Sequence, residues 1–348
     1  MIPTTSSIVL NKINYASLIL ATALANAGIK VIIIHSSSNL SEEVTLEFDA
    51  YDKAFLTSIG FDVSTPLSLT ELFEQSKKML TKHLCNILWE TQIGKVNELD
   101  KEVIAWIKNG QRVIEHKTRH IIESEDLLIM DTSSTIKHIA TYYWKLEGSF
   151  NNYINPLVLS SQAEEKRLIS DFYTSRKSVA DRIKGLLNKK EKGTLNIRES
   201  KLSLHLSQDR DIEAGDLLPN LIVYDEKKKS ETSFYEWCKP GMFCMLMIGQ
   251  LSQENLFNIA KWVQANFPIH LFYLPPTEKN QHIFEKFKIV EGEKKTLIIR
   301  PDQYIGLIND RIDLEIVDNY LTNFIRFETK GKPAKNKLLG QNSIENYP

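Results

Sequence analysis

The sequence predicts an α/β fold built of two domains, and three observations lead to this prediction. The first is an apolar run, a helix and a second apolar run in the order of a βαβ unit, within residues 6–37. The second is a change of composition near Gly215, followed by segments in the order β-α-β-α-β-β-α. The third is the length of 348 residues with 42% hydrophobic and 25% charged side chains, which suits two globular domains.

The predicted domains follow from these observations. We expect a reduced Rossmann-like domain, of the type that binds FAD or NAD(P), over residues 1–194, and a linker over 195–213. A thioredoxin-like domain is expected over 214–328 and a flexible tail over 329–348. In this second domain the segment MIGQLSQEN, after the first central strand, has no cysteine, so the thioredoxin-like character concerns shape and not thiol chemistry.

The βαβ unit has the form of a nucleotide-binding unit without its nucleotide-binding residues. In a working unit, glycines in the first turn let backbone N–H groups approach a pyrophosphate at the helix N-terminus. Here Lys12, Asn14 and Ser17 stand at those positions, and His35 stands where an acidic residue holds the ribose. We expect these side chains to prevent the close approach, although the Lys12 charge could still attract a smaller anion.

The rest of the first domain is predicted to alternate helices and strands. A helix is expected over 47–59, and Ser68 with Glu71 forms a capping box that opens the next helix. Residues 87–130 read as strands, with a type I′ hairpin at Asn109-Gly110 and a buried strand ending at Asp131. A further capping box, Ser161 with Glu164, is expected to open a long helix.

Charge and cysteine content exclude several classes of function. The 43 basic and 44 acidic side chains leave a net charge of −1, so we expect neither a nucleic-acid nor a membrane partner. Cysteines at 85, 238 and 244 are too few for a disulfide framework or a zinc site, which predicts a reducing, cytoplasmic location. The histidines show no metal-binding spacing.

Four stretches together resemble the FAD-dependent aromatic-ring hydroxylases of the phenol hydroxylase type, which carry a thioredoxin-like C-terminal domain. They are the βαβ unit, the segment from LTELFEQ through the Asn-Gly hairpin to LLIMDTSST, the segment from YYWKLEGSF through the long helix, and AGDLLPNLIVYDE with LIIRPDQYIGLI. The resemblance implies FAD as cofactor, and subunit contacts through the C-terminal domain.

The departures from that family are concentrated at the cofactor site. Besides the lost glycines, the family's Gly-x-Asp-Gly motif is represented by IMDTSS, in which Asp131 survives. The family's large substrate-binding sheet has no room between Thr135 and Tyr142. We therefore expect degenerate cofactor positions at Lys12, Asn14, Ser17, His35 and Asp131, with no catalytic residue and no metal ligand.

Three hypotheses follow for the function. The preferred one is a non-catalytic binding or assembly protein without a cofactor, which forms homo-oligomers or pairs with an active hydroxylase. The second is a surviving FAD- or NAD(P)H-dependent oxidoreductase of the aromatic-hydroxylase type with an altered cofactor site. The third is a small-anion or small-molecule binding protein that uses the vacated cleft.

Overall fold

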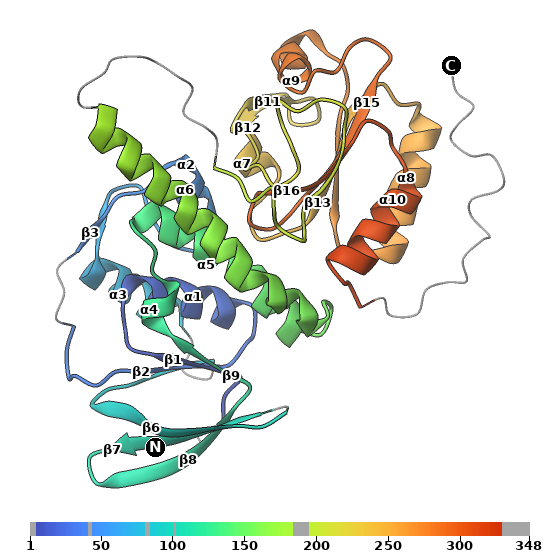
Figure 1. Ribbon diagram of the computed structural model, residues 1–348. Coiled ribbons are helices and arrows are strands. Elements are labelled where there is room, and N and C mark those ends of the chain that lie inside the picture. Colours follow the sequence, from blue (N-terminus) through green and yellow to red (C-terminus); the bar gives the residue numbers. More distant parts are fainter. Residues whose placement is uncertain (1–4, 41–43, 81–83, 101, 184–194, 329–348) are drawn as a thin grey trace. The chain divides into compact units, whose positions relative to one another are not determined.

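The computed structural model describes residues 5–40, 44–80, 84–100, 102–183 and 195–328 (Figure 1). The chain divides into two compact units. The first unit contains Met1–Asn151 and Glu165–Lys190, and the second contains Asn152–Glu164 and Glu191–Pro348. None of the helices in the described residues is long and apolar enough to cross a membrane.

A parallel sheet of four strands forms the centre of the first unit, in the order β5-β2-β1-β9. The strands are β1 (Ile8–Asn11), β2 (Val31–Ile34), β5 (Cys85–Leu88) and β9 (His120–Glu123). The order of the strands reverses at β1, because the chain runs outward through β2 and β5 and then returns to the other side with β9. The predicted βαβ unit is confirmed, and this α/β arrangement is Rossmann-like.

Helices cover one face of the parallel sheet, and a second sheet covers the other (Figure 1). Helix α1 (Tyr15–Asn26) is buried from Ala16 to Ala25, because the sheet lies on one side and α3 and α5 on the other. The second sheet is antiparallel, with β6 (Thr91–Glu98), β7 (Val103–Asn109) and β8 (Arg112–Thr118). Apolar side chains of β7 form one buried cluster with those of β1 and β2.

The hairpin between β7 and β8 differs from the prediction by one residue. Asn109 pairs with Arg112, so the loop consists of Gly110 and Gln111. Gly110 has a φ of 59°, whereas Gln111 has no positive φ. This pattern is that of a type II′ turn and not of the predicted type I′ turn, which requires positive φ at both central residues.

The remaining elements of the first unit are mostly helices. They are β3 (Thr45–Leu46), α2 (Ala50–Ser58), β4 (Leu67–Ser68), α3 (Leu69–Met79), α4 (Ser124–Leu127), α5 (Thr132–Phe150) and most of α6 (Gln162–Ile183). The capping box of Ser68 and Glu71 is present at the start of α3, as predicted. The strand predicted to end at Asp131 is wrong, since α4 ends at Leu127, residues 128–131 form no strand, and Asp131 caps α5.

The capping box predicted at Ser161 is also wrong. A 3₁₀ turn, η1 (Pro156–Ser161), runs directly into α6, so the first N–H groups of α6 find carbonyl partners in the preceding turn. The Ser161 hydroxyl donates to the carbonyl of Val158, 2.9 Å away, instead of capping the helix.

The second unit is built on a five-stranded mixed sheet in the order β10-β16-β15-β13-β14. β13 is parallel to β14 and antiparallel to β15, and β10 joins the edge parallel to β16. Its strands and helices are β10 (Leu204–Leu206), β11 (Ile222–Asp225), β12 (Ser230–Ser233), α7 (Phe234–Trp237), β13 (Cys244–Gly249), α8 (Gln253–Asn266), β14 (His270–Leu274), η2 (Glu278–Asn280), α9 (Gln281–Lys286), β15 (Lys294–Ile299), β16 (Ile305–Asn309), α10 (Leu314–Asn319) and the π-helical turn η3 (Tyr320–Phe324). The order of elements from β13 to α10 is the predicted β-α-β-α-β-β-α order.

Candidate functional site

A cavity of about 490 Å³ opens at the carboxyl end of the parallel sheet in the first unit. Ligands of open α/β sheets bind at this end, in the crevice where the strand order reverses. The lining comes from the ends of β1 and β9, from residues two positions beyond β2 and in the first turn of α4, and from the start of β6. Its polar side chains are Asn11, Lys12, Ser36, Thr91, Gln92, Glu123 and Glu125.

The charged groups of this cavity have hydrogen-bond partners within its lining. The Lys12 Nζ donates to Glu125 Oε1 at 2.8 Å, and the Asn11 amide donates to Glu123 Oε2 at 2.7 Å. The hydrogen bond from Lys12 holds the pKa of Glu125 below its usual value, so this carboxylate is ionised at neutral pH. The described lining therefore carries one cation and two carboxylates, an unfavourable balance for a small anion.

The turn between β1 and α1 keeps a backbone shape that glycine usually supplies. Lys12 has a φ of 82°, in the left-handed region. Such a conformation costs a residue other than glycine about 1 kcal/mol or more. Neighbouring groups hold it in place, because the Ser124 hydroxyl donates to the Lys12 carbonyl at 2.6 Å.

Side chains occupy the N-terminus of α1. The Ser17 N–H donates to Asn14 Oδ1 at 2.8 Å, and the Asn14 N–H donates to Ser17 Oγ at 2.9 Å. The Asn14 amide also donates to the Ser124 carbonyl at 3.0 Å. This capping box satisfies N–H groups that a glycine turn would present to a phosphate.

His35 supports the same turn from β2. Its Nδ1 accepts a hydrogen bond from the Ile13 N–H at 3.2 Å, and its ring lies edge-on to Trp89 with centroids 5.4 Å apart. Burial is the main cause that lowers the pKa of His35, and the charge of Lys12 lowers it further. The neutral, buried imidazole therefore stabilises the turn through this hydrogen bond and does not serve as a ribose ligand.

The five residues predicted for the site thus separate into three groups. Lys12 lines the cavity, whereas Asn14, Ser17 and His35 hold the turn behind it. Asp131 is not part of the cavity lining, and its carboxylate accepts from the Ser134 N–H at the start of α5.

Two carboxylates of the lining, Glu123 and Glu125, were not predicted. They lie at the end of β9 and in the first turn of α4, and they reach the cavity because β9 pairs with β1. The sequence signal for them is the short apolar strand followed by acidic residues, HIIESED.

A second cluster of polar side chains surrounds Ser133, whose hydroxyl group is a candidate nucleophile. Its hydroxyl donates to Asp49 Oδ2 at 2.9 Å and accepts from Lys137 Nζ at 2.5 Å. Burial opposes the Lys137 charge, but the carboxylates of Asp52 and Asp49 outweigh it, so the pKa of Lys137 lies above its usual value. Lys137 is therefore a cation at neutral pH and cannot take a proton from the serine.

The described residues also contain no group of three or more histidine, cysteine, aspartate or glutamate side chains arranged to hold a metal ion.

The fold is that of FAD-dependent aromatic hydroxylases, as the resemblance implied. No protein-family model and no curated protein matches the chain. The likeness is to solved structures at low sequence identity, and it concerns the fold.

Three of these structures illustrate the likeness. A ternary complex of aklavinone-11 hydroxylase with FAD and aklavinone has a TM-score of 0.69 at 10% identity, covering 93% of this chain and 100% of the other. The flavin-dependent monooxygenase PieE, in complex with FAD and substrate, has a TM-score of 0.66 at 7% identity, covering 92% and 99%. CabE, an aromatic hydroxylase from angucycline biosynthesis, has a TM-score of 0.62 at 11% identity, covering 92% and 99%.

These comparisons contradict the preferred hypothesis of a non-catalytic binding protein and the expectation that no cofactor binds. The structures with this fold are described as hydroxylases and monooxygenases, and two of them hold FAD. The alternative of an oxidoreductase with an altered cofactor site agrees better with them. The error came from reading the lost glycines as the loss of the whole site, although the cavity at the strand ends persists.

The residues of the cavity fit one part of FAD and not another. The carboxylates, the amides and the hydroxyl groups of the lining suit the hydroxyl-rich ribityl chain and ribose, because hydroxyl groups both donate and accept hydrogen bonds. The capping box of α1 does not fit a pyrophosphate bound at the helix N-terminus. A dinucleotide in this cavity would have to place its phosphates elsewhere, near Lys12.

Proposed function

We propose that the protein is an FAD-dependent oxidoreductase of the aromatic-hydroxylase type with an altered cofactor site. The observation that carries the proposal is the cavity of about 490 Å³ at the carboxyl ends of β1, β2 and β9, where this fold binds dinucleotides. The fold shared with flavin-containing hydroxylases supports it. The flavin would supply the redox chemistry, and the cavity residues would bind and orient it.

Glu123 and Glu125 accept hydrogen bonds from the hydroxyl groups of the cofactor in this proposal. Lys12 supplies the positive charge that the helix N-terminus no longer offers. This division of roles predicts weaker binding than a glycine turn gives, because one exposed lysine replaces several aligned N–H groups.

The test is an absorbance spectrum of the purified protein, followed by titration with FAD during thermal and chemical unfolding. We expect either a visible flavin band or saturable binding. Binding should raise the free energy of unfolding by about 2.7 kcal/mol when free FAD is a hundredfold above Kd. A colourless protein whose stability does not respond to FAD would contradict the proposal.

Two lysine variants show whether binding uses this cavity. Lys12→Met should weaken FAD binding, because it removes the cation of the described lining. Lys30→Met is the matched control, since Lys30 immediately precedes β2 at the amino end of the sheet and should leave binding unchanged. Equal effects of the two variants would place the cofactor outside the cavity.

We also infer that the second unit is thioredoxin-like in shape. The β-α-β-α-β-β-α order and the sheet order β16-β15-β13-β14 support this inference. The three cysteines of the chain are free and buried, and burial raises the pKa of Cys85 to about 12 and that of Cys238 well above its usual value. The shape therefore serves something other than thiol exchange.

A further inference from the structure

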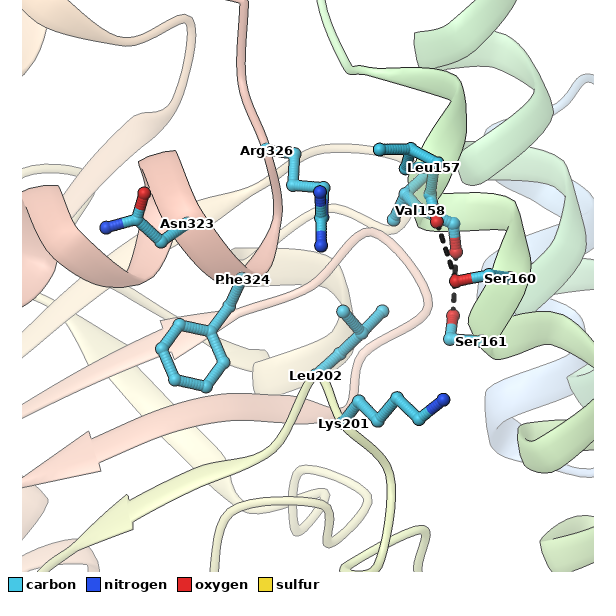
Figure 2. Close-up of a pocket in the computed structure, with 9 residues that line it drawn as sticks. All are labelled: Leu157, Val158, Ser160, Ser161, Lys201, Leu202, Asn323, Phe324 and Arg326. Atoms are coloured by element: carbon cyan, nitrogen blue, oxygen red, sulfur yellow. Dashed lines mark hydrogen bonds between the residues drawn. The ribbon is translucent and has the colours of Figure 1, made fainter.

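A second hollow, of about 130 Å³, lies entirely within the second unit (Figure 2). Its lining combines an apolar floor with two basic side chains, Lys201 and Arg326. The floor consists of the buried Val158 and Leu202 and the half-buried Phe324, and the exposed Leu157 lies at its side. We propose that this hollow binds a small organic carboxylate with a compact apolar body, a site separate from the flavin cavity and independent of the proposed function.

The two sides of the hollow are fixed to each other by backbone pairing. The Asn155 N–H donates to the Arg326 carbonyl at 2.9 Å, and the Glu328 N–H donates to the Tyr153 carbonyl at 2.8 Å. The rings of Tyr153 and Phe327 stack with centroids 6.0 Å apart. Residues 153–158 and 324–328 therefore form one frame, and the hollow between them is preorganised.

The lining of the hollow contains basic side chains without acidic ones. No acidic side chain belongs to the lining, and neither Lys201 nor Arg326 forms an ion pair with a described residue. In Figure 2 the Arg326 side chain reaches into the hollow between Phe324 and Leu157, and the Lys201 side chain extends toward Ser161. An anion in this place meets two cations and displaces no carboxylate.

The backbone at Arg326 is held in an unfavourable conformation. Its φ is 66°, in the left-handed region, which residues other than glycine rarely adopt. A glycine would relieve this strain, yet the chain places an arginine here with its guanidinium toward the hollow. This φ is that of a residue just past the end of a helix, because the Phe327 N–H donates to the Leu321 carbonyl at 3.0 Å across this turn.

The size and the chemistry of the hollow define the ligand. An apolar cavity of about 150 Å³ can hold a benzene molecule, so a hollow of about 130 Å³ suits a single ring or a short branched chain. The apolar floor selects against inorganic phosphate, which has no apolar surface to bury. A guanidinium binds a carboxylate through two parallel hydrogen bonds, which selects the head group.

The experiment uses benzoate as the probe on the full chain, with binding measured by saturation-transfer NMR and calorimetry. We expect a Kd of about 1 mM, a value in keeping with the few atoms of the probe. Benzyl alcohol, which has the ring without the charge, and inorganic phosphate, which has the charge without the ring, should each bind at least tenfold more weakly. No saturable binding of benzoate, or equal binding of phosphate, would overturn the proposal.

Three variants test whether benzoate binds in this hollow. Arg326→Gly should abolish benzoate binding while the protein stays folded, because glycine accepts the positive φ. Lys201→Met should weaken binding several-fold, and Lys261→Met, on α8 outside the hollow, is the matched control. Benzoate binding that persists in Arg326→Gly would overturn the assignment of the site.

Discussion

The pKa of Asp52 lies well above that of an aspartate in water. Its side chain is fully buried beside Lys137, with the Nζ 3.2 Å from Asp52 Oδ1. Burial raises the pKa of Asp52 to about 6, against the opposing effect of the Lys137 charge. Asp49 shows the contrary case: it is partly exposed, and its bonds with Lys137 lower its pKa in spite of burial. The pKa values of two carboxylates that contact the same lysine are thus shifted in opposite directions.

A pH dependence of stability follows from Asp52. Because its pKa in the folded state is above the unfolded value, the folded state binds the proton more tightly, and this contribution is lost as the pH rises through about 6. Between pH 4 and pH 7 the loss is roughly 2 to 3 kcal/mol, at about 1.4 kcal/mol per pKa unit. Asp52→Asn should remove that slope, whereas the exposed Asp100→Asn should keep it. Urea unfolding at several pH values measures the difference, and identical slopes in wild type and Asp52→Asn would contradict the prediction.

The candidate site shows which residues a sequence can bring together. Lys12, Asn14 and His35 were predicted as neighbours because the carboxyl ends of parallel strands meet at one edge. Glu123 and Glu125 join them through the pairing of β9 with β1, which connects residues more than a hundred positions apart. No local pattern encodes that pairing, so the sequence could not predict the negative charge of the cavity.

At the scale of elements, local signals predicted well where the partner is close in sequence. The capping box at Ser68 depends on a residue three positions away and is present. The box at Ser161 failed because the preceding residues form a 3₁₀ turn. The strand expected before Asp131 failed because the apolar run begins inside the short helix α4 and then continues as an irregular segment. An apolar run of that length does not by itself identify a strand.

Gly215 gives a prediction at the same scale, since it links the segment before β10 with β16. Its φ is 92°, and an added Cβ would lie 2.4 Å from the Cα of Arg198. Gly215→Ala should therefore destabilise the fold by roughly 3 kcal/mol or more, because the neighbouring backbone must move. Gly241→Ala is the matched control, with a φ of 89° but no atom within 4 Å of the Cβ, and should cost only about 1 kcal/mol. Chemical unfolding of both variants compares them, and equal losses would refute the role of the close contact.

At the scale of the whole molecule, the two units are interleaved along the chain. Residues 152–164 belong to the second unit, and the chain then returns to the first through α6. The pairing of Ile154 with Phe327 fixes this crossing, and it joins segments separated by most of the second unit. Changes of composition along the sequence cannot indicate such an arrangement, because no single segment has an unusual composition.

Self-association is the prediction that belongs to the whole chain. Among the described residues, β14 pairs with β13 and closes one side of its sheet, and four of its five residues are at least partly exposed. An edge strand of this kind can pair with the same strand of a second copy about a twofold axis. Light scattering at tens of micromolar should give roughly 80 kDa, twice the chain mass of 40.0 kDa.

The edge that mediates this association can be tested directly. Leu271→Lys places a charge on β14, at the second of its five residues, and should shift the mass toward the monomer, because charged edge strands resist pairing. Phe257→Lys, which replaces an exposed apolar side chain on α8, should leave the mass unchanged. A wild-type monomer of 40.0 kDa would refute self-association. A dimer unaffected by Leu271→Lys would place the contact on another surface of the chain.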